Sequence, residues 1–73
     1  MKAKAIIFYR KALAVYSVAS EAKNNYTAQL VKYKGDEKNA PPEMIMFSKQ
    51  GRHCSGSTDN QDLMDDICDA VHS

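Results

Sequence analysis

The clearest pattern of apolar and polar residues lies in the C-terminal third of the chain. Five apolar residues recur there at helical spacing: Leu63, Met64, Ile67, Cys68 and Val71. This spacing predicts an amphipathic helix with a buried apolar stripe and an opposite face of aspartates. Thr58 and Gln61 stand three residues apart just before the apolar run, as in a capping box. We therefore expect Thr58 to cap the start of this helix.

A strand signal precedes the helix in the run MIMF. Ile45 and Phe47 share one face of this strand, and Met44 and Met46 share the other, because side chains alternate along a strand. A strand that is apolar on both faces lies at the centre of a sheet or has one face covered from outside the chain. The two methionines are therefore candidates for contact with a partner.

The pattern over residues 3–22 does not distinguish clearly between a strand and a helix. Neither parity of alternation is consistently polar, and six alanines favour a helix. The β-branched and aromatic residues favour a strand, and no capping residue precedes the run. We favour one long strand that bends or bulges near Arg10 and Lys11, with a helix as the open alternative.

Polar segments separate the predicted strands. A turn over residues 21–25, where Asn24 and Asn25 tolerate a left-handed backbone, leads to a strand over residues 26–33, the expected hairpin partner of residues 12–20. A polar loop over residues 34–41 ends at two prolines. Residues 48–51 form the next turn, where Gly51 can adopt a positive φ, and the chain then returns as a short strand before the helix.

These segments predict an α+β fold. We expect an antiparallel meander of three or four strands with one C-terminal helix packed on one face, as a single small domain spanning residues 1–73. A chain of this size buries only about 60% of its unfolded surface, so the core is small. One helix covers one face of such a sheet and leaves the other face open.

Composition and charge narrow the function classes. Hydrophobic residues make up 44% and charged residues 26%, which is typical of a folded globular chain. No window approaches the roughly 20 apolar residues of a membrane span, and no secretion signal is evident. We therefore expect no membrane association and a cytoplasmic location.

The net charge of +1 hides an uneven distribution. Residues 1–58 hold all ten Lys and Arg residues and four of the nine acidic residues, a formal charge of +6. Residues 59–73 hold five aspartates and no Lys or Arg, a formal charge of −5. The body of the chain can therefore meet an acidic partner, or it can complement its own acidic helix.

Candidate chemistry is sparse. Cys54, Cys68 and His72, with His53, are thinkable Zn²⁺ ligands, but His53 and Cys54 are strand neighbours and point to opposite faces. A Cys/His nucleophile pair lacks a third group to orient the base. We expect both cysteines to be free apolar core residues, because a cytoplasmic location disfavours a structural disulfide. No enzyme activity, metal or cofactor is expected.

Two resemblances bear on the fold. If residues 4–22 formed a helix, the order α-β-β-β-α would resemble a double-stranded-RNA-binding domain. That family has lysines at the start of its last helix, where this chain has aspartates, so its function is not transferred. The pattern of Pro41-Pro42-Glu43, Lys49-Gln-Gly-Arg52 and Gly56-Ser57-x-Asp59 resembles small uncharacterised bacterial proteins. That resemblance implies an α+β meander, a bacterial or phage source and no known activity.

Two functions follow from these observations. The first is a non-enzymatic interaction or regulatory module that binds a protein partner or a second copy through the sheet face left open by the helix. Its candidate interface residues are Met44, Met46 and Tyr33. The alternative is nucleic-acid binding by a basic sheet face with interleaved tyrosines. Its candidate contacts are Arg10, Lys11, Lys32, Lys49 and Arg52.

Overall fold

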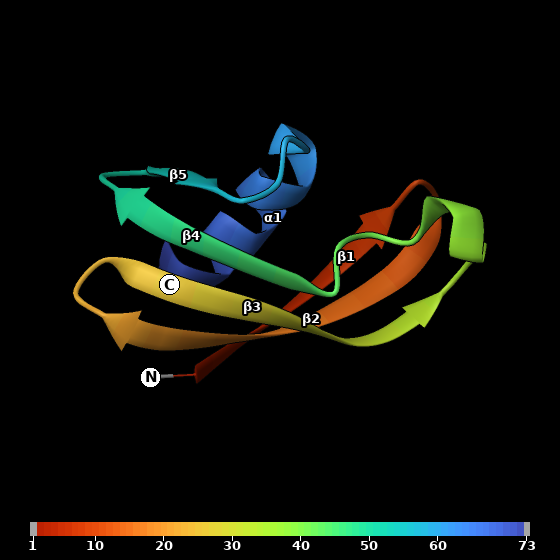
Figure 1. The fold of residues 1–73 in the computed structure, drawn as a ribbon, viewed down its shortest axis with the longest axis horizontal. Helices are drawn as coiled ribbons and strands as arrows, with labels where there is room; N and C mark the ends of the chain where they lie inside the picture. Colours follow the sequence, from red (N-terminus) through yellow and green to blue (C-terminus); the bar gives the residue numbers. More distant parts are fainter. Residues whose placement is uncertain (1, 73) are drawn as a thin grey trace.

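The computed structural model describes residues 2–72 and has an α+β fold (Figure 1). Five strands follow one another along the chain: β1 (Lys2–Tyr9), β2 (Ala12–Ala22), β3 (Asn25–Lys34), β4 (Met44–Gln50) and β5 (His53–Gly56). They form one antiparallel sheet in the order β1-β2-β3-β4-β5. The helix α1 (Gln61–His72) packs on one face and contacts β1, β2 and β5. The predicted meander with one C-terminal helix is confirmed.

The sheet has five strands, and the prediction of three or four is wrong. The extra strand comes from the N-terminal segment, where we expected one bent or bulged strand. The chain instead reverses at Arg10 and Lys11, and β1 pairs with β2 in unbroken register. Both turn residues have positive φ, 52° and 66°. Turns with this backbone geometry normally contain Asn and Gly. Because the chain has Arg and Lys at these two positions, no residue type in the sequence indicated the turn.

The remaining turns follow the predicted chemistry with small shifts. Asn24, between β2 and β3, has φ 65°, and Gly51, between β4 and β5, has φ 62°. Strand β4 continues to Gln50, so its turn starts at Gly51 and does not include residues 48–50. The predicted polar loop before β4 contains one 3₁₀ turn (Glu37–Asn39).

The core lies between α1 and the sheet face that we call the inner face. Its strand residues are every second residue, in accordance with the pleat of a sheet. The buried cluster consists of Ala5, Ile7, Ala14, Tyr16, Val18, Ala28, Ile45, Phe47 and Cys54 from the sheet and Leu63, Met64, Ile67, Cys68 and Val71 from α1. The predicted apolar stripe of the helix is therefore confirmed in full.

The helix begins later than the predicted capping box. The side-chain oxygen of Asn60 accepts a hydrogen bond from the Leu63 N–H at 3.1 Å, which makes Asn60 the N-cap. The Thr58 hydroxyl accepts from the Asn60 N–H at 3.2 Å and so shapes the approach to the helix. Asn and Thr are both favourable N-cap residues. Asn60 is the one that caps α1, because it is nearer to Leu63, where the apolar stripe begins.

The expectation of free core cysteines is wrong, although both residues are buried. Cys54 of β5 and Cys68 of α1 form a disulfide with a Cα–Cα distance of 5.9 Å. Their exposed fractions are 1% and 3%. The sequence placed both cysteines in the core between sheet and helix, but only the packing of α1 onto β5 brings them face to face.

A buried tyrosine holds the loop before β4 against the sheet. Tyr16 is 0% exposed, and its hydroxyl donates a hydrogen bond to the Pro42 carbonyl at 2.5 Å. Burial, followed by the nearby Tyr9, raises the pKa of Tyr16 to about 12. The contact joins β2 to a segment 26 residues further along the chain.

Candidate interaction face

The sheet face opposite α1, which we call the outer face, carries large exposed apolar side chains. Strand pairing places Ile6 beside Val15 and Phe8 beside Leu13, while Met44 and Met46 occupy the same face of β4. Val31 is the extra residue of a β3 bulge opposite Val15 and Tyr16. We call five of these residues the outer apolar patch: Ile6, Phe8, Val31, Met44 and Met46, which are 51–78% exposed.

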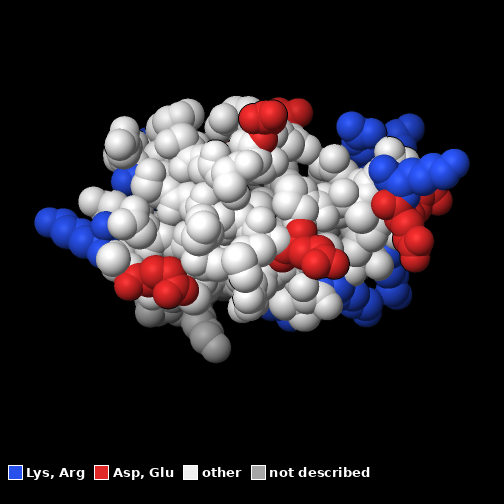
Figure 2. All heavy atoms as spheres, in the orientation of Figure 1, with Lys and Arg blue, Asp and Glu red and all other residues white. Residues whose placement is uncertain are grey.

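Exposed side chains of this size and number are uncommon on one face of a small domain. Large exposed apolar side chains gathered on one face often mark contact sites for other molecules. In Figure 2 the Lys and Arg side chains lie mainly towards the two ends of the molecule, and acidic side chains stand among the uncharged residues between them. The strand register places Ser17, Gln29 and Lys32 on the outer face between the apolar side chains of β1 and those of β4, so the patch consists of two apolar groups with polar residues between them.

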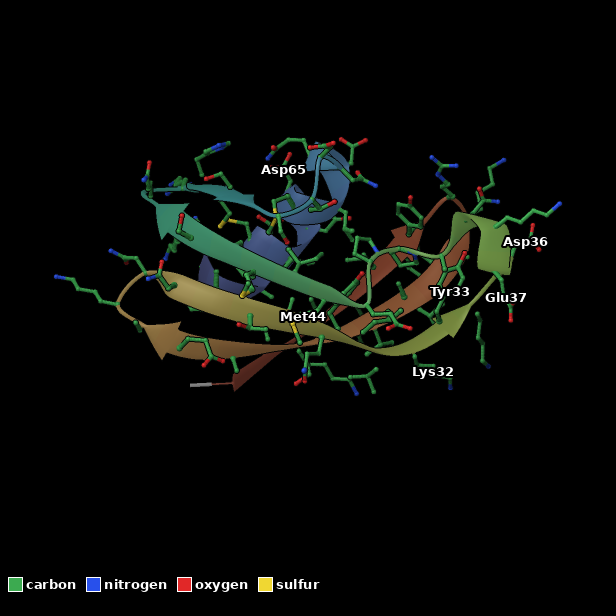
Figure 3. All side chains as sticks on the ribbon, viewed as in Figure 1. Lys32, Tyr33, Asp36, Glu37, Met44 and Asp65 are labelled. Atoms are coloured by element: carbon green, nitrogen blue, oxygen red, sulfur yellow. A yellow bond between two sulfur atoms is a disulfide. The ribbon has the colours of Figure 1, made fainter. Side chains whose placement is uncertain are left out.

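Only two of the three predicted interface residues, Met44 and Tyr33, line the same pocket. Met44 and Met46 are on the outer face and are 51% and 62% exposed. Tyr33 pairs with the fully buried Ala14, so its side chain belongs to the inner face and packs against the core (Figure 3). Tyr33 nevertheless lines a pocket together with Met44, whereas Met46 is not among the residues that line it.

Sequence reasoning missed Ile6, Phe8 and Val31. The run AIIFY in β1 is apolar on both faces, as MIMF is in β4, and this signal could have identified Ile6 and Phe8. It was obscured because residues 3–20 were treated as one strand, which hides the reversal at Arg10 and Lys11. No sequence signal marks Val31, because its exposure depends on a bulge.

The predicted nucleic-acid contacts fall into two groups. Arg10 and Lys11 form the β1–β2 turn, and Lys32 lies on the same end of β3. Lys49 is half-buried on β4, and Arg52 is in the β4–β5 turn at the other end of a molecule 34 Å long. The five cations therefore do not form one continuous stripe.

Arg10 is held in place by its neighbours. Its guanidinium donates a hydrogen bond to the Asn39 side-chain oxygen at 3.0 Å. It also lies 5.5 Å from the centre of the Tyr9 ring, within the range of a cation–π contact. Arg10 thus links the β1–β2 turn to the loop before β4.

The tyrosines are engaged in packing. Tyr16 is fully buried, and Tyr26 stacks on Phe47 with ring centres 5.3 Å apart. Tyr9 and Tyr33 are half-buried against the core. Stacking on nucleic-acid bases needs exposed ring faces, so this arrangement does not favour that function.

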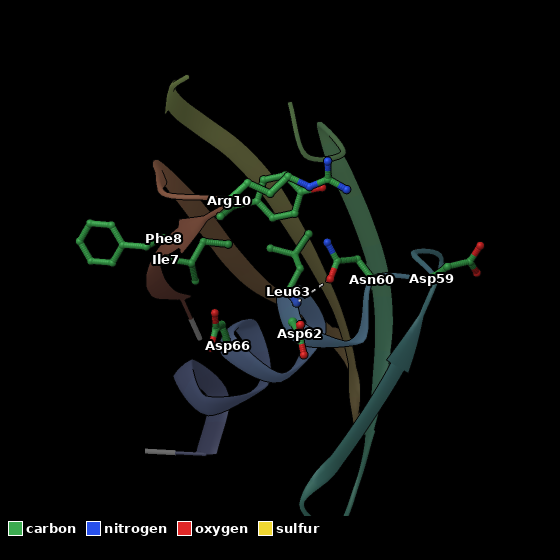
Figure 4. A pocket seen from close by; sticks show the side chains of 9 residues that line it. Ile7, Phe8, Arg10, Asp59, Asn60, Asp62, Leu63 and Asp66 are labelled. Carbon is green, nitrogen blue, oxygen red and sulfur yellow. Dashed lines mark hydrogen bonds between the residues drawn. The ribbon is translucent and has the colours of Figure 1, made fainter. Parts of the chain in front are cut away.

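A groove opens between the end of β1 and the start of α1, with a volume of about 540 Å³. Ile7, Phe8 and Arg10 line one side, and Asp62 and Asp66 line the other (Figure 4). Burial, followed by the neighbouring carboxylates, first among them that of Asp69, raises the pKa of Asp66. The groove is therefore acidic on its helix side.

The structure limits the chemistry available to the cysteines and histidines. The Cys54–Cys68 disulfide leaves neither sulfur as a thiolate, so neither can be a metal ligand or a nucleophile in this state. Within residues 2–72, no three side chains of His, Cys, Asp or Glu cluster closely enough to hold a metal ion.

Two further observations concern the chain as a whole. Among the described helices, none has the length and apolar character needed to cross a membrane. No protein-family model, no curated protein and no solved structure matches the sequence or the fold. The outer face and the groove are therefore interpreted from their geometry.

Proposed function

We propose that this chain is a non-enzymatic interaction module that binds a protein partner through the outer apolar patch. The exposure of Phe8 at 78%, Met46 at 62% and Ile6 at 59% carries this proposal. The helix packs on the inner face, whereas these three side chains are largely exposed on the outer one. Exposed apolar surface costs solubility, so its presence on one face favours a binding role.

The patch supports binding of moderate strength. Burying the exposed portions of five large apolar side chains contributes about 5–9 kcal/mol, from about 1.5–3 kcal/mol for each fully buried side chain. Association itself costs about 4–15 kcal/mol in lost translational and rotational freedom. A lasting complex therefore needs polar contacts around the patch as well, and the basic residues at its ends are suited to an acidic rim on the partner.

Nucleic-acid binding, the alternative prediction, has weaker support. Its five cations are divided between two ends, and the tyrosines pack into the core. The cellular location is also a proposal. The sequence favours the cytoplasm, whereas the disulfide is typical of an oxidising compartment. Alkylation of thiols in intact cells, before lysis, distinguishes the two.

The outer patch is tested by paired substitutions. A partner captured from the source cells is purified and titrated with wild-type chain, with a Met44→Ser/Met46→Ser variant and with an Asp69→Ser control, whose site is on α1. The proposal predicts that the methionine pair weakens binding at least tenfold and that the control changes it less than twofold. Equal affinity for all three chains would refute the patch.

Self-association is tested separately. Sedimentation of the purified chain at micromolar concentration distinguishes a monomer from a dimer formed through the outer face. A dimer that the Met44→Ser/Met46→Ser variant dissociates identifies a second copy as the partner. The proposed function is excluded if the chain is a strict monomer and the Met44→Ser/Met46→Ser variant binds the partner as tightly as the wild type does.

A further inference from the structure

Strand β1 forms an open edge of the sheet. It is eight residues long, contains no proline and pairs with β2 in unbroken register. In residues 2–72, β2 is its single strand neighbour. The other edge strand, β5, has four residues. A long, regular edge presents backbone N–H and C=O groups that another strand can pair with, and proteins usually shorten or interrupt such edges.

Different surfaces flank this edge on its two sides. On the outer side, Ile6 and Phe8 are 59% and 78% exposed. On the inner side lies the groove lined by Ile7, Asp62 and Asp66. Phe8 also lines the groove, so the groove reaches the edge of the sheet. Figure 4 shows Asp62 and Asp66 on α1 below Ile7, with Phe8 pointing away from the molecule.

The two sides determine what an added strand must carry. Its side chains alternate between the faces of the sheet. Those on the outer side become neighbours of Lys4, Ile6 and Phe8, so the residues beside Ile6 and Phe8 are expected to be apolar. Those on the inner side enter the groove beside Asp62 and Asp66, where a Lys or Arg complements the carboxylates. Asp59 adds a third carboxylate, and Arg10 is the cation at the turn end of the groove.

A second copy of this chain fits the edge poorly. Pairing β1 with its own copy would place Ile7 and Tyr9 of each chain in the acidic groove of the other, with no cation among them. It would also bring the acidic faces of two α1 helices towards each other on the same side of the sheet. Juxtaposed like charges disfavour such an interface.

We therefore infer that the free edge of β1 binds an extended segment of a partner protein in which basic residues alternate with apolar ones. The segment adds a sixth strand to the sheet, with its apolar residues on Ile6 and Phe8 and its basic residues beside Asp62 and Asp66. This inference rests on the proposed role as an interaction module, but it uses a surface that Met44 and Met46 do not form. Main-chain pairing supplies affinity, and the alternating side chains supply specificity.

The probe is a fluorescein-labelled decapeptide of alternating Lys and Val, titrated into the full chain and followed by anisotropy. Amide exchange measured by NMR locates the binding site. We expect added protection in residues 2–9 and weaker binding by an alternating Glu and Val peptide. Replacing both groove carboxylates, Asp62→Asn/Asp66→Asn, should weaken binding of the Lys and Val peptide roughly 2- to 30-fold, as for two partly screened charge pairs.

The matched control is Asp65→Asn/Asp69→Asn. These residues are on the same helix but do not line the groove, so the variant has the same net charge and keeps every side chain that lines the groove. We expect a change below twofold. The inference would be overturned if both double variants weakened binding of the Lys and Val peptide equally, or if the Glu and Val peptide bound equally well. It would also be overturned if the Lys and Val peptide did not bind, or if it protected amides outside β1.

The same variants separate the inference from the proposed function. If Met44→Ser/Met46→Ser abolishes partner binding but the Lys and Val peptide does not bind, the proposed function of the outer apolar patch is supported and the inference about the edge of β1 is refuted. If the peptide protects the amides of β1 and the methionine variant binds its partner as the wild type does, the inference about the edge of β1 is supported and the proposed function of the outer apolar patch is refuted.

Discussion

The Cys54–Cys68 disulfide should provide a large part of the stability of this protein. It joins β5 to α1 across 14 positions of sequence, closing a loop of about 15 residues. Loop closure of this length stabilises the fold by about 3 kcal/mol, chiefly by restricting the unfolded chain. A 73-residue domain has a total unfolding free energy of about 4–11 kcal/mol, so reduction should remove a quarter or more of it.

The assay is thermal unfolding followed by circular dichroism, with and without a phosphine reductant. For a domain of this size, a loss of about 3 kcal/mol lowers Tm by about 12–24 °C. The Cys54→Ala/Cys68→Ala variant should unfold near the temperature of the reduced wild type. Its Tm should not respond to the reductant, which controls for effects of the reductant itself.

Two results would refute the reasoning. The first is a purified wild type, never exposed to reductant, whose mass after alkylation shows that both cysteines were free thiols. The second is a verified disulfide whose reduction leaves Tm unchanged. In that case the packing of α1 against the sheet holds β5 in place without the covalent link.

Three further changes test individual contacts by chemical denaturation. Lys11→Gly should stabilise the protein by about 1 kcal/mol, because glycine relieves the left-handed backbone at this position of the β1–β2 turn and Arg10 keeps its contacts; no gain would contradict the turn geometry. Asn60→Ala should cost about 1 kcal/mol through loss of the helix cap. The Tyr16 pKa of about 12 exceeds its ordinary value of 10, so this residue's stabilising effect is complete below pH 10 and should be lost as pH rises through 12. Tyr16→Phe should abolish that pH dependence, and an unchanged profile would argue against it.

Much of the fold could be predicted because local signals agreed. The apolar stripe from Leu63 to Val71 specified a helix and its buried face, and MIMF specified a strand with opposite faces. Asn24 and Gly51 marked turns through their tolerance of positive φ. In each case a short stretch of chain contains all the information that its conformation requires.

The candidate site was only partly predictable. Met44 and Met46 were found because one strand with two apolar faces implies an open face. Ile6 and Phe8 were missed because the turn at Arg10 and Lys11 has no glycine or asparagine to mark it. The acidic groove could not be anticipated, because it forms where α1 crosses the end of β1.

The amino-acid sequence by itself therefore determined the class of the fold, the helix with its apolar stripe, and the two faces of β4. Tertiary structure decided the number of strands, the Asn60 cap, the disulfide and the surfaces beside β1. The difference has one physical reason. Periodicity and turn chemistry are local properties, whereas the pairing of Cys54 with Cys68 and the closeness of Asp66 to Ile7 depend on how α1 packs against the sheet.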